Sequence, residues 1–142
     1  MLIAAALLDD VIAHARAEYD AECCGLLGYA SDGDQRPRAV RVHRATNVFA
    51  TDPKGSASKR FEIDGRELLR TLDAFEREGL ELGAIYHSHT RTEPHPSQTD
   101  INFAANWPGL EWVIVGLAAE QPEVRCYLID GAHVREVPLE VS

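Results

Sequence analysis

The stretch IYHSHTRTEPHPSQTD, from Ile85 to Asp100, joins the end of an apolar segment to a polar one that contains three histidines and two prolines. Residues 81–89, ELGAIYHSH, predict a strand with an apolar middle and a polar end. Because side chains alternate between the two faces of a strand, His87 and His89 project to one side and Ser88 to the other. Two imidazoles on one face supply half of a zinc site, although a histidine pair is also typical of a solvated strand end.

The second half of the stretch has two interpretations, which are compatible. Ser97 and Asp100 form a Ser-x-x-Asp capping box directly after Pro96, and this pattern predicts a helix that begins at Ser97. Asp100 also lies eleven residues after His89, so the loop and one helical turn can bring its carboxylate back to the histidines. Two histidines and one carboxylate leave a fourth position open for water, as in catalytic rather than structural zinc sites.

The rest of the chain predicts a mixed α/β fold, in which about three helices surround a central sheet within one domain over residues 1–142. The expected strands are residues 24–30, 38–47, 111–119, 123–130 and 133–141, with a turn at 31–34 and a hairpin turn at 130–132. Residues 48–60 predict a flexible surface loop because they are rich in glycine, proline and serine. Residues 61–64, FEID, predict a short extended segment.

Helical spacing of apolar residues indicates two further helices. The first ends near Tyr19, and its polar residues Asp9, Asp10, His14 and Arg16 are expected to face water or the helix ends. The second covers residues 65–78, with Asp64 as its N-cap and Gly79 as its end. Its expected buried stripe consists of Leu68, Leu69, Leu72 and Phe75.

Composition excludes several classes of function. The formal net charge of -9 disfavours nucleic acid and anionic membrane surfaces as partners. We find neither a secretory signal nor a membrane span, and three cysteines do not form an even disulfide framework, so we expect a reducing cytoplasm. Cys23, Cys24 and Cys126 are expected to act as small buried hydrophobic residues. The oligomeric state is left open.

The chain resembles the JAMM family of MPN-type zinc metalloproteases. HSHTRTEPHPSQTD matches the motif His-x-His, seven residues, Ser, two residues, Asp, and AECCGLLGY resembles the N-terminal signature with Glu22 at the acidic position. FEID resembles a further family segment. The resemblance implies a JAMM/MPN domain with a cytidine-deaminase-like layout. It also implies that His87, His89 and Asp100 bind Zn²⁺, that Glu22 is the general base, and that Ser97 donates a hydrogen bond to the oxyanion.

His95 lies between the defined positions of the motif, which does not require it, and we expect it to face solvent. His14, His43 and His133 are expected to be structural or exposed. Thr90 follows the second motif histidine, where many members have proline, and in this the chain is similar to bacterial Mec-type peptidases. That resemblance implies a ubiquitin-like sulfur-carrier protein as substrate. A non-catalytic MPN-type scaffold and a deubiquitinase-like isopeptidase remain alternatives, and residues 48–60 either contact the substrate tail or are uninvolved. A zinc deaminase is disfavoured because the chain has no Cys-x-x-Cys.

Overall fold

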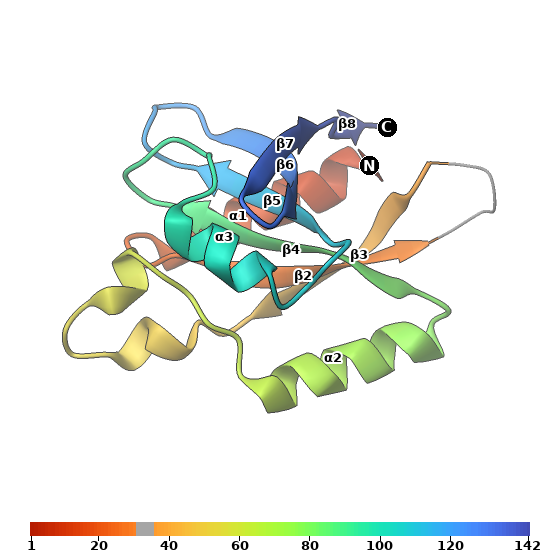
Figure 1. The fold of residues 1–142 in the computed structure, drawn as a ribbon, viewed down its shortest axis with the longest axis horizontal. Coiled ribbons are helices and arrows are strands. Elements are labelled where there is room, and N and C mark those ends of the chain that lie inside the picture. Colours follow the sequence, from red (N-terminus) through yellow and green to blue (C-terminus); the bar gives the residue numbers. More distant parts are fainter. Residues whose placement is uncertain (31–35) are drawn as a thin grey trace.

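The computed structural model describes residues 1–30 and 36–142, and it is built on one mixed sheet of eight strands in the order β7-β6-β5-β4-β2-β3-β1-β8 (Figure 1). The turn expected at residues 31–34 lies outside the described residues. β4 occupies the middle of the sheet, where it pairs antiparallel with β2 and parallel with β5. The strands are β1 (Leu2–Ile3), β2 (Cys24–Ala30), β3 (Arg38–Ala45), β4 (Glu81–His89), β5 (Glu111–Gly116), β6 (Glu123–Asp130), β7 (His133–Val137) and β8 (Glu140–Val141).

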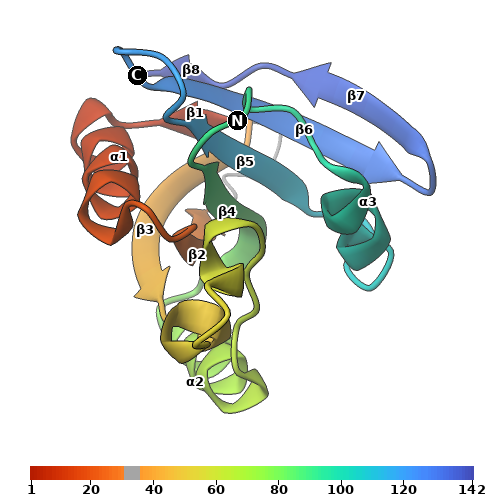
Figure 2. The same ribbon diagram turned by 90° about the vertical axis from the view of Figure 1, so that its left-hand side faces the viewer.

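Helices cover both faces of the sheet, as Figure 2 shows for α1 (Ala5–Glu18) and α3 (Gln98–Ala104). The alternation of side chains along each strand divides the core between the two faces. Tyr86 belongs to the cluster that packs against α1, whereas its neighbour Ile85 belongs to the cluster that includes Phe75 of α2 (Gly65–Arg77) and Ala104 of α3. The same alternation assigns His87 to the face of Ile85, beside α2 and α3. The mixed α/β fold with three helices is therefore confirmed.

Two of the expectations for the helices are wrong. Leu69 is 68% exposed, because the buried stripe of α2 runs through Thr71 and Phe75, and Leu69, two residues before Thr71, lies on the opposite side of the helix. His14 does not face water either: it is buried, and its Nδ1 lies 2.7 Å from the hydroxyl of Tyr86. The N-cap at Asp64 is confirmed by its bond from Arg66 N at 2.7 Å.

Tyr86 lies against the sheet because Gly25 has no side chain. A Cβ at Gly25 would stand 2.2 Å from the tyrosine ring, far inside contact distance. The glycine thus allows the ring to cross β2 and reach His14 on α1. No side chain other than hydrogen fits there without moving the ring.

Residues 48–60, expected as a surface loop, contain helical turns that the sequence did not predict. They form two short 3-10 helices, Val48–Thr51 and Ser56–Ser58, and Ala57 is buried. At the other end of the chain the expected hairpin is confirmed, since Asp130 pairs with His133. The two-residue strand β1, which pairs with β3 and β8, was not expected from the sequence. Among the described helices, none has both the length and the apolar character needed to cross a membrane.

Candidate metal centre

The end of β4 carries the two motif histidines on one face of the sheet, as the alternation predicted. His87 is fully buried and His89 is 7% exposed, and their Nε2 atoms lie 3.1 Å apart. Ser88 points to the opposite face, where its hydroxyl accepts a hydrogen bond from Cys23 N at 2.8 Å. This bond ties β4 to the residue that follows Glu22.

Asp100 closes a triangle with the histidine pair. Its Oδ2 lies 3.1 Å from Nε2 of His87 and 3.1 Å from Nε2 of His89. The capping box fixes this carboxylate, since Asp100 N donates to Ser97 Oγ at 3.1 Å and Ser97 N donates to Asp100 Oδ2 at 3.0 Å. The predicted capping box is therefore confirmed, and the capped helix presents Asp100 to the two histidines.

The tautomer of His89 is set by the loop that follows β4. Nδ1 lies 2.9 Å from the carbonyl oxygen of Glu93, which can only accept, so the ring donates there. In the neutral ring Nε2 then carries a lone pair, directed at Asp100 and His87. Burial alone would lower the pKa of His89, but the hydrogen bonds to Asp100 and Glu93 outweigh it and raise the pKa. Burial opposes ionisation of Asp100, but the two histidines hold the pKa of its carboxyl well below its usual range.

These three atoms fit a metal ion. A tetrahedral ion with bonds of about 2.0–2.1 Å separates neighbouring ligand atoms by roughly 3.3 Å, close to the sides of the triangle. A carboxylate oxygen and the lone pair of His89 repel each other unless a proton or a cation lies between them, and a metal ion would relieve this repulsion. The hydrogen bond from His89 Nδ1 to Glu93 O is the kind of support that metal-binding histidines typically have, whereas the buried Nδ1 of His87 has no hydrogen-bond partner among the described residues.

Glu22 lies beside this triangle, with a carboxylate oxygen within 4.8 Å of ligand atoms of His87 and His89. Its backbone is held on both sides: Glu22 N donates to Ala57 O at 2.7 Å, and Glu22 O accepts from Asn47 Nδ2 at 3.1 Å. Burial raises the pKa of Glu22 to about 7, against the opposing effect of the two histidines. The carboxylate is thereby poised to gain and lose a proton near neutral pH.

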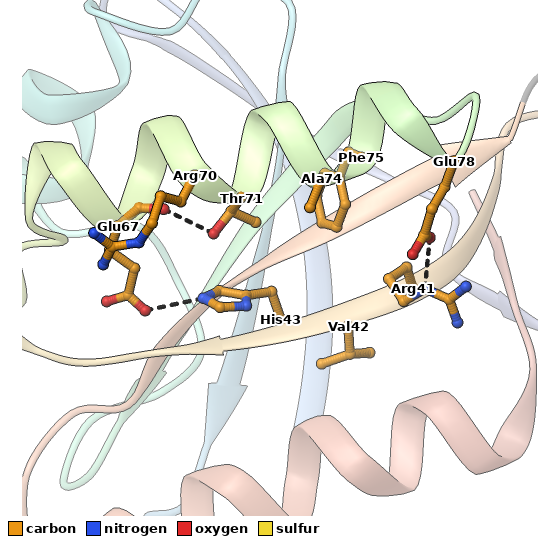
Figure 3. A pocket seen from close by; sticks show the side chains of 9 residues that line it. All are labelled: Arg41, Val42, His43, Glu67, Arg70, Thr71, Ala74, Phe75 and Glu78. Atoms are coloured by element: carbon orange, nitrogen blue, oxygen red, sulfur yellow. Dashed lines mark hydrogen bonds and ion pairs between the residues drawn. The ribbon is translucent and has the colours of Figure 1, made fainter.

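A pocket of about 340 Å³ reaches one corner of the triangle, His89, together with Glu22 and Ser97. It is lined by Glu22, Ser58, Lys59, His89, Thr90, Arg91, Thr92 and Ser97. A second pocket of about 310 Å³ lies between β3 and α2, and two pairs of polar side chains span it (Figure 3). There His43 lies 2.9 Å from Glu67, and Arg41 lies 2.8 Å from Glu78. Of these two pockets, the one of about 340 Å³ is lined by predicted site residues, namely Glu22, His89 and Ser97.

Residues 4–130 match the protein family described as prokaryotic homologs of the JAB domain. The chain belongs to this family. Over 99% of its length, this JAB domain is 32% identical to the CysO-cysteine peptidase of Mycobacterium tuberculosis, of which it covers 90%. It is 35% identical over 134 residues to the probable TtuB-protein conjugate cleaving protease of Thermus thermophilus, covering 94% of this chain and 79% of the relative. The fold matches that of a JAB1/MPN domain protein from Archaeoglobus fulgidus with a TM-score of 0.64 at 21% identity, covering 99% and 98% of the two chains.

The JAB domain brings together all five residues expected from the sequence: Glu22, His87, His89, Ser97 and Asp100. His95 stays outside the group, where its ring packs edge-on against Tyr127 at 5.6 Å. The three cysteines are buried and unpaired, and burial raises their pKa values, to about 12 for Cys23. These side chains are structural, as expected.

Two supporting residues of the JAB domain were missed. Buried Asn47 makes four hydrogen bonds, two from its amide nitrogen to Glu22 O and Arg60 O, and two accepted from Phe49 N and Glu62 N. Phe61 stacks on the His87 ring with centroids 4.6 Å apart. The Asx turn formed by Asn47 and Phe49 was the only sequence signal for the first, and its contact with Glu22 is not local.

Proposed function

We propose that this JAB domain is a zinc-dependent peptidase that cleaves a peptide or isopeptide bond at the C-terminal tail of a ubiquitin-like sulfur-carrier protein. The observation that carries the proposal is the triangle of His87, His89 and Asp100, with Glu22 beside it in an open pocket. Two imidazoles and a carboxylate are a donor set found in catalytic zinc enzymes. The names of the relatives support a peptidase and the class of substrate.

In this proposal His87, His89 and Asp100 hold the zinc ion. When bound, zinc would supply Lewis acidity at the scissile carbonyl. Glu22 accepts a proton from the attacking water and delivers it to the leaving amine, a role that suits a carboxylate whose pKa is raised by burial to about 7. Ser97, at the pocket wall, donates a hydrogen bond to the oxyanion, a contact that typically contributes about 3 kcal/mol.

The roles are tested by separating metal binding from turnover. Glu22→Gln should retain bound zinc, measured by elemental analysis, while cleavage falls by about two orders of magnitude or more. Asp100→Asn should lose the metal, because the carboxylate at one corner of the triangle is replaced by a neutral amide. Glu81→Gln, a matched change at an exposed position at the start of β4, should alter neither. Near wild-type cleavage by Glu22→Gln would show that another group moves the proton.

The substrate is tested with CysO, the protein that the name of the Mycobacterium tuberculosis relative contains, extended by one C-terminal cysteine, and the products are identified by mass spectrometry. Removal of the added cysteine from CysO by the zinc-loaded protein supports the proposal. A protein conjugate, in which the carrier tail is joined to a lysine, is the second candidate, and the Thermus thermophilus relative favours it. A chain that binds no zinc and cleaves neither substrate would instead be a scaffold.

A further inference from the structure

Two cationic side chains share the pocket with the proposed catalytic groups. Lys59 and Arg91 line it together with Glu22 and Ser97, although the chain as a whole carries a net charge of -9. The ion pairs of the described residues involve other arginines and neither of these two. Both charges are therefore free to meet a ligand in the pocket.

The backbone places Lys59 although its side chain is exposed. Lys59 N donates to Ser56 O at 3.0 Å, and the carbonyls on either side of it are held as well. Ser58 O accepts from the hydroxyl of buried Thr90 at 3.4 Å, and Arg60 O accepts from Asn47 Nδ2 at 3.0 Å. These contacts fix the start of the lysine side chain at the pocket.

Arg91 reaches the same place from the opposite segment, because it directly follows Thr90. The Thr90–Ser58 contact thus brings together two segments 32 residues apart and puts one cation on each. The neighbouring Arg60 serves a different purpose: its guanidinium lies 3.9 Å above the Phe49 ring. Figure 1 shows the segment between β3 and α2 beside the end of β4.

We propose that Lys59 and Arg91 form a carboxylate subsite that selects substrates in which the leaving group is a free C-terminal amino acid. The inference rests on the proposed function. An amino acid released from the carrier tail bears an α-carboxylate next to the scissile bond, whereas a lysine within a conjugated protein bears none. A guanidinium and an ammonium are the groups that bind a carboxylate through charge-assisted hydrogen bonds.

The reaction balances as a hydrolysis. Water oxygen bonds to the carrier's terminal carbonyl carbon, the carbon–nitrogen bond breaks, and both protons of the water end on the nitrogen, the first of them carried by Glu22. The products are the carrier carboxylate and an amino acid with a free ammonium group. The carboxylate bound by Lys59 and Arg91 belongs to the leaving amino acid and is unchanged by the reaction.

The test compares CysO extended by one cysteine as the free acid with the same protein as the C-terminal carboxamide. Zinc-loaded wild type should cleave the acid with a kcat/KM roughly tenfold or more above that of the amide, since a charge-assisted bond is at stake. In Lys59→Met/Arg91→Gln the ratio should fall toward one. Lys54→Met, which removes the same charge from the same segment outside the pocket, should keep the wild-type ratio.

A second readout needs no turnover. In the Glu22→Gln background the acid should bind more tightly than the amide, and the double substitution should remove that difference. Equal kcat/KM for both substrates in wild type, or an equal loss for both in the double variant, would overturn the subsite and leave the peptidase standing. Cleavage of neither by wild type would overturn the proposed function and the subsite with it.

Discussion

Replacing Tyr127 with phenylalanine should weaken metal binding although Tyr127 belongs to β6 and is no ligand. Its hydroxyl donates to Pro94 O at 2.8 Å in a buried position, and Pro94 also lies close against Gly116. The carbonyl oxygen of the preceding residue, Glu93, accepts the hydrogen bond from His89 Nδ1. The hydroxyl therefore holds the loop that orients a proposed ligand.

The magnitude follows from the hydrogen bond that is lost. A buried carbonyl left without its donor costs about 1–3 kcal/mol, so we expect Tyr127→Phe to lower the free energy of unfolding by about 1–2 kcal/mol. For a chain of this size the melting temperature should drop by roughly 3–6 °C. Changes behind a metal-binding histidine typically cost about 10- to 100-fold in affinity, and we expect about tenfold because Tyr127 acts through Pro94.

Zinc affinity is measured by competition with a chromophoric chelator, and stability by urea unfolding of the metal-free protein. Tyr29→Phe is the matched control, because it removes a hydroxyl that donates to Glu111 at 3.0 Å, away from the loop. It should reduce stability and leave zinc affinity unchanged. If both variants bind zinc equally well, the loop does not depend on Tyr127 and the reasoning is wrong.

Three further predictions concern the packing around the site. Gly25→Ala should destabilise by about 1–3 kcal/mol, because its Cβ would meet the Tyr86 ring at 2.2 Å, and this cost in urea unfolding should largely vanish in a Tyr86→Leu background. Burial, helped by Arg44, lowers the pKa of His14, so its contribution to stability is complete above the unfolded pKa of about 6.5 and is lost as pH falls through the folded pKa. Urea midpoints of metal-free wild type should therefore drop more between pH 8 and pH 5.5 than those of His14→Gln. Equal drops would contradict a contribution of His14 to the pH dependence of stability. Finally, Leu69→Ala should change the unfolding free energy by less than about 0.5 kcal/mol, against about 3–5 for Phe75→Ala. A large loss at Leu69 would contradict its exposure.

The parts of the fold that could be predicted depend on local patterns. The position of His87 and His89 on one face follows from strand alternation, and the capped helix at Asp100 follows from a four-residue motif. The hairpin at Gly131 is likewise a local turn. Glu22 was different, because it lies 65 residues before His87, and only the family signature connected the two.

The features that were missed depend on contacts between distant segments. Residues 48–60 have the composition of a loose loop, but Asn47 and Glu22 hold their backbone through bonds that no local pattern encodes. His14 is polar and lies on an amphipathic helix, which predicts exposure. It is buried because Tyr86, 72 residues later, offers it a hydroxyl across Gly25.

The burial of Cys23, Cys24 and Cys126 has a practical consequence. Their thiols stay protonated at neutral pH because burial raises their pKa values, and they are shielded from reagents in the folded chain. A cysteine introduced at exposed Thr51 would then be the reactive thiol for a maleimide fluorophore. Movement of the segment beside the pocket during substrate binding can thus be followed by fluorescence without first replacing the native cysteines.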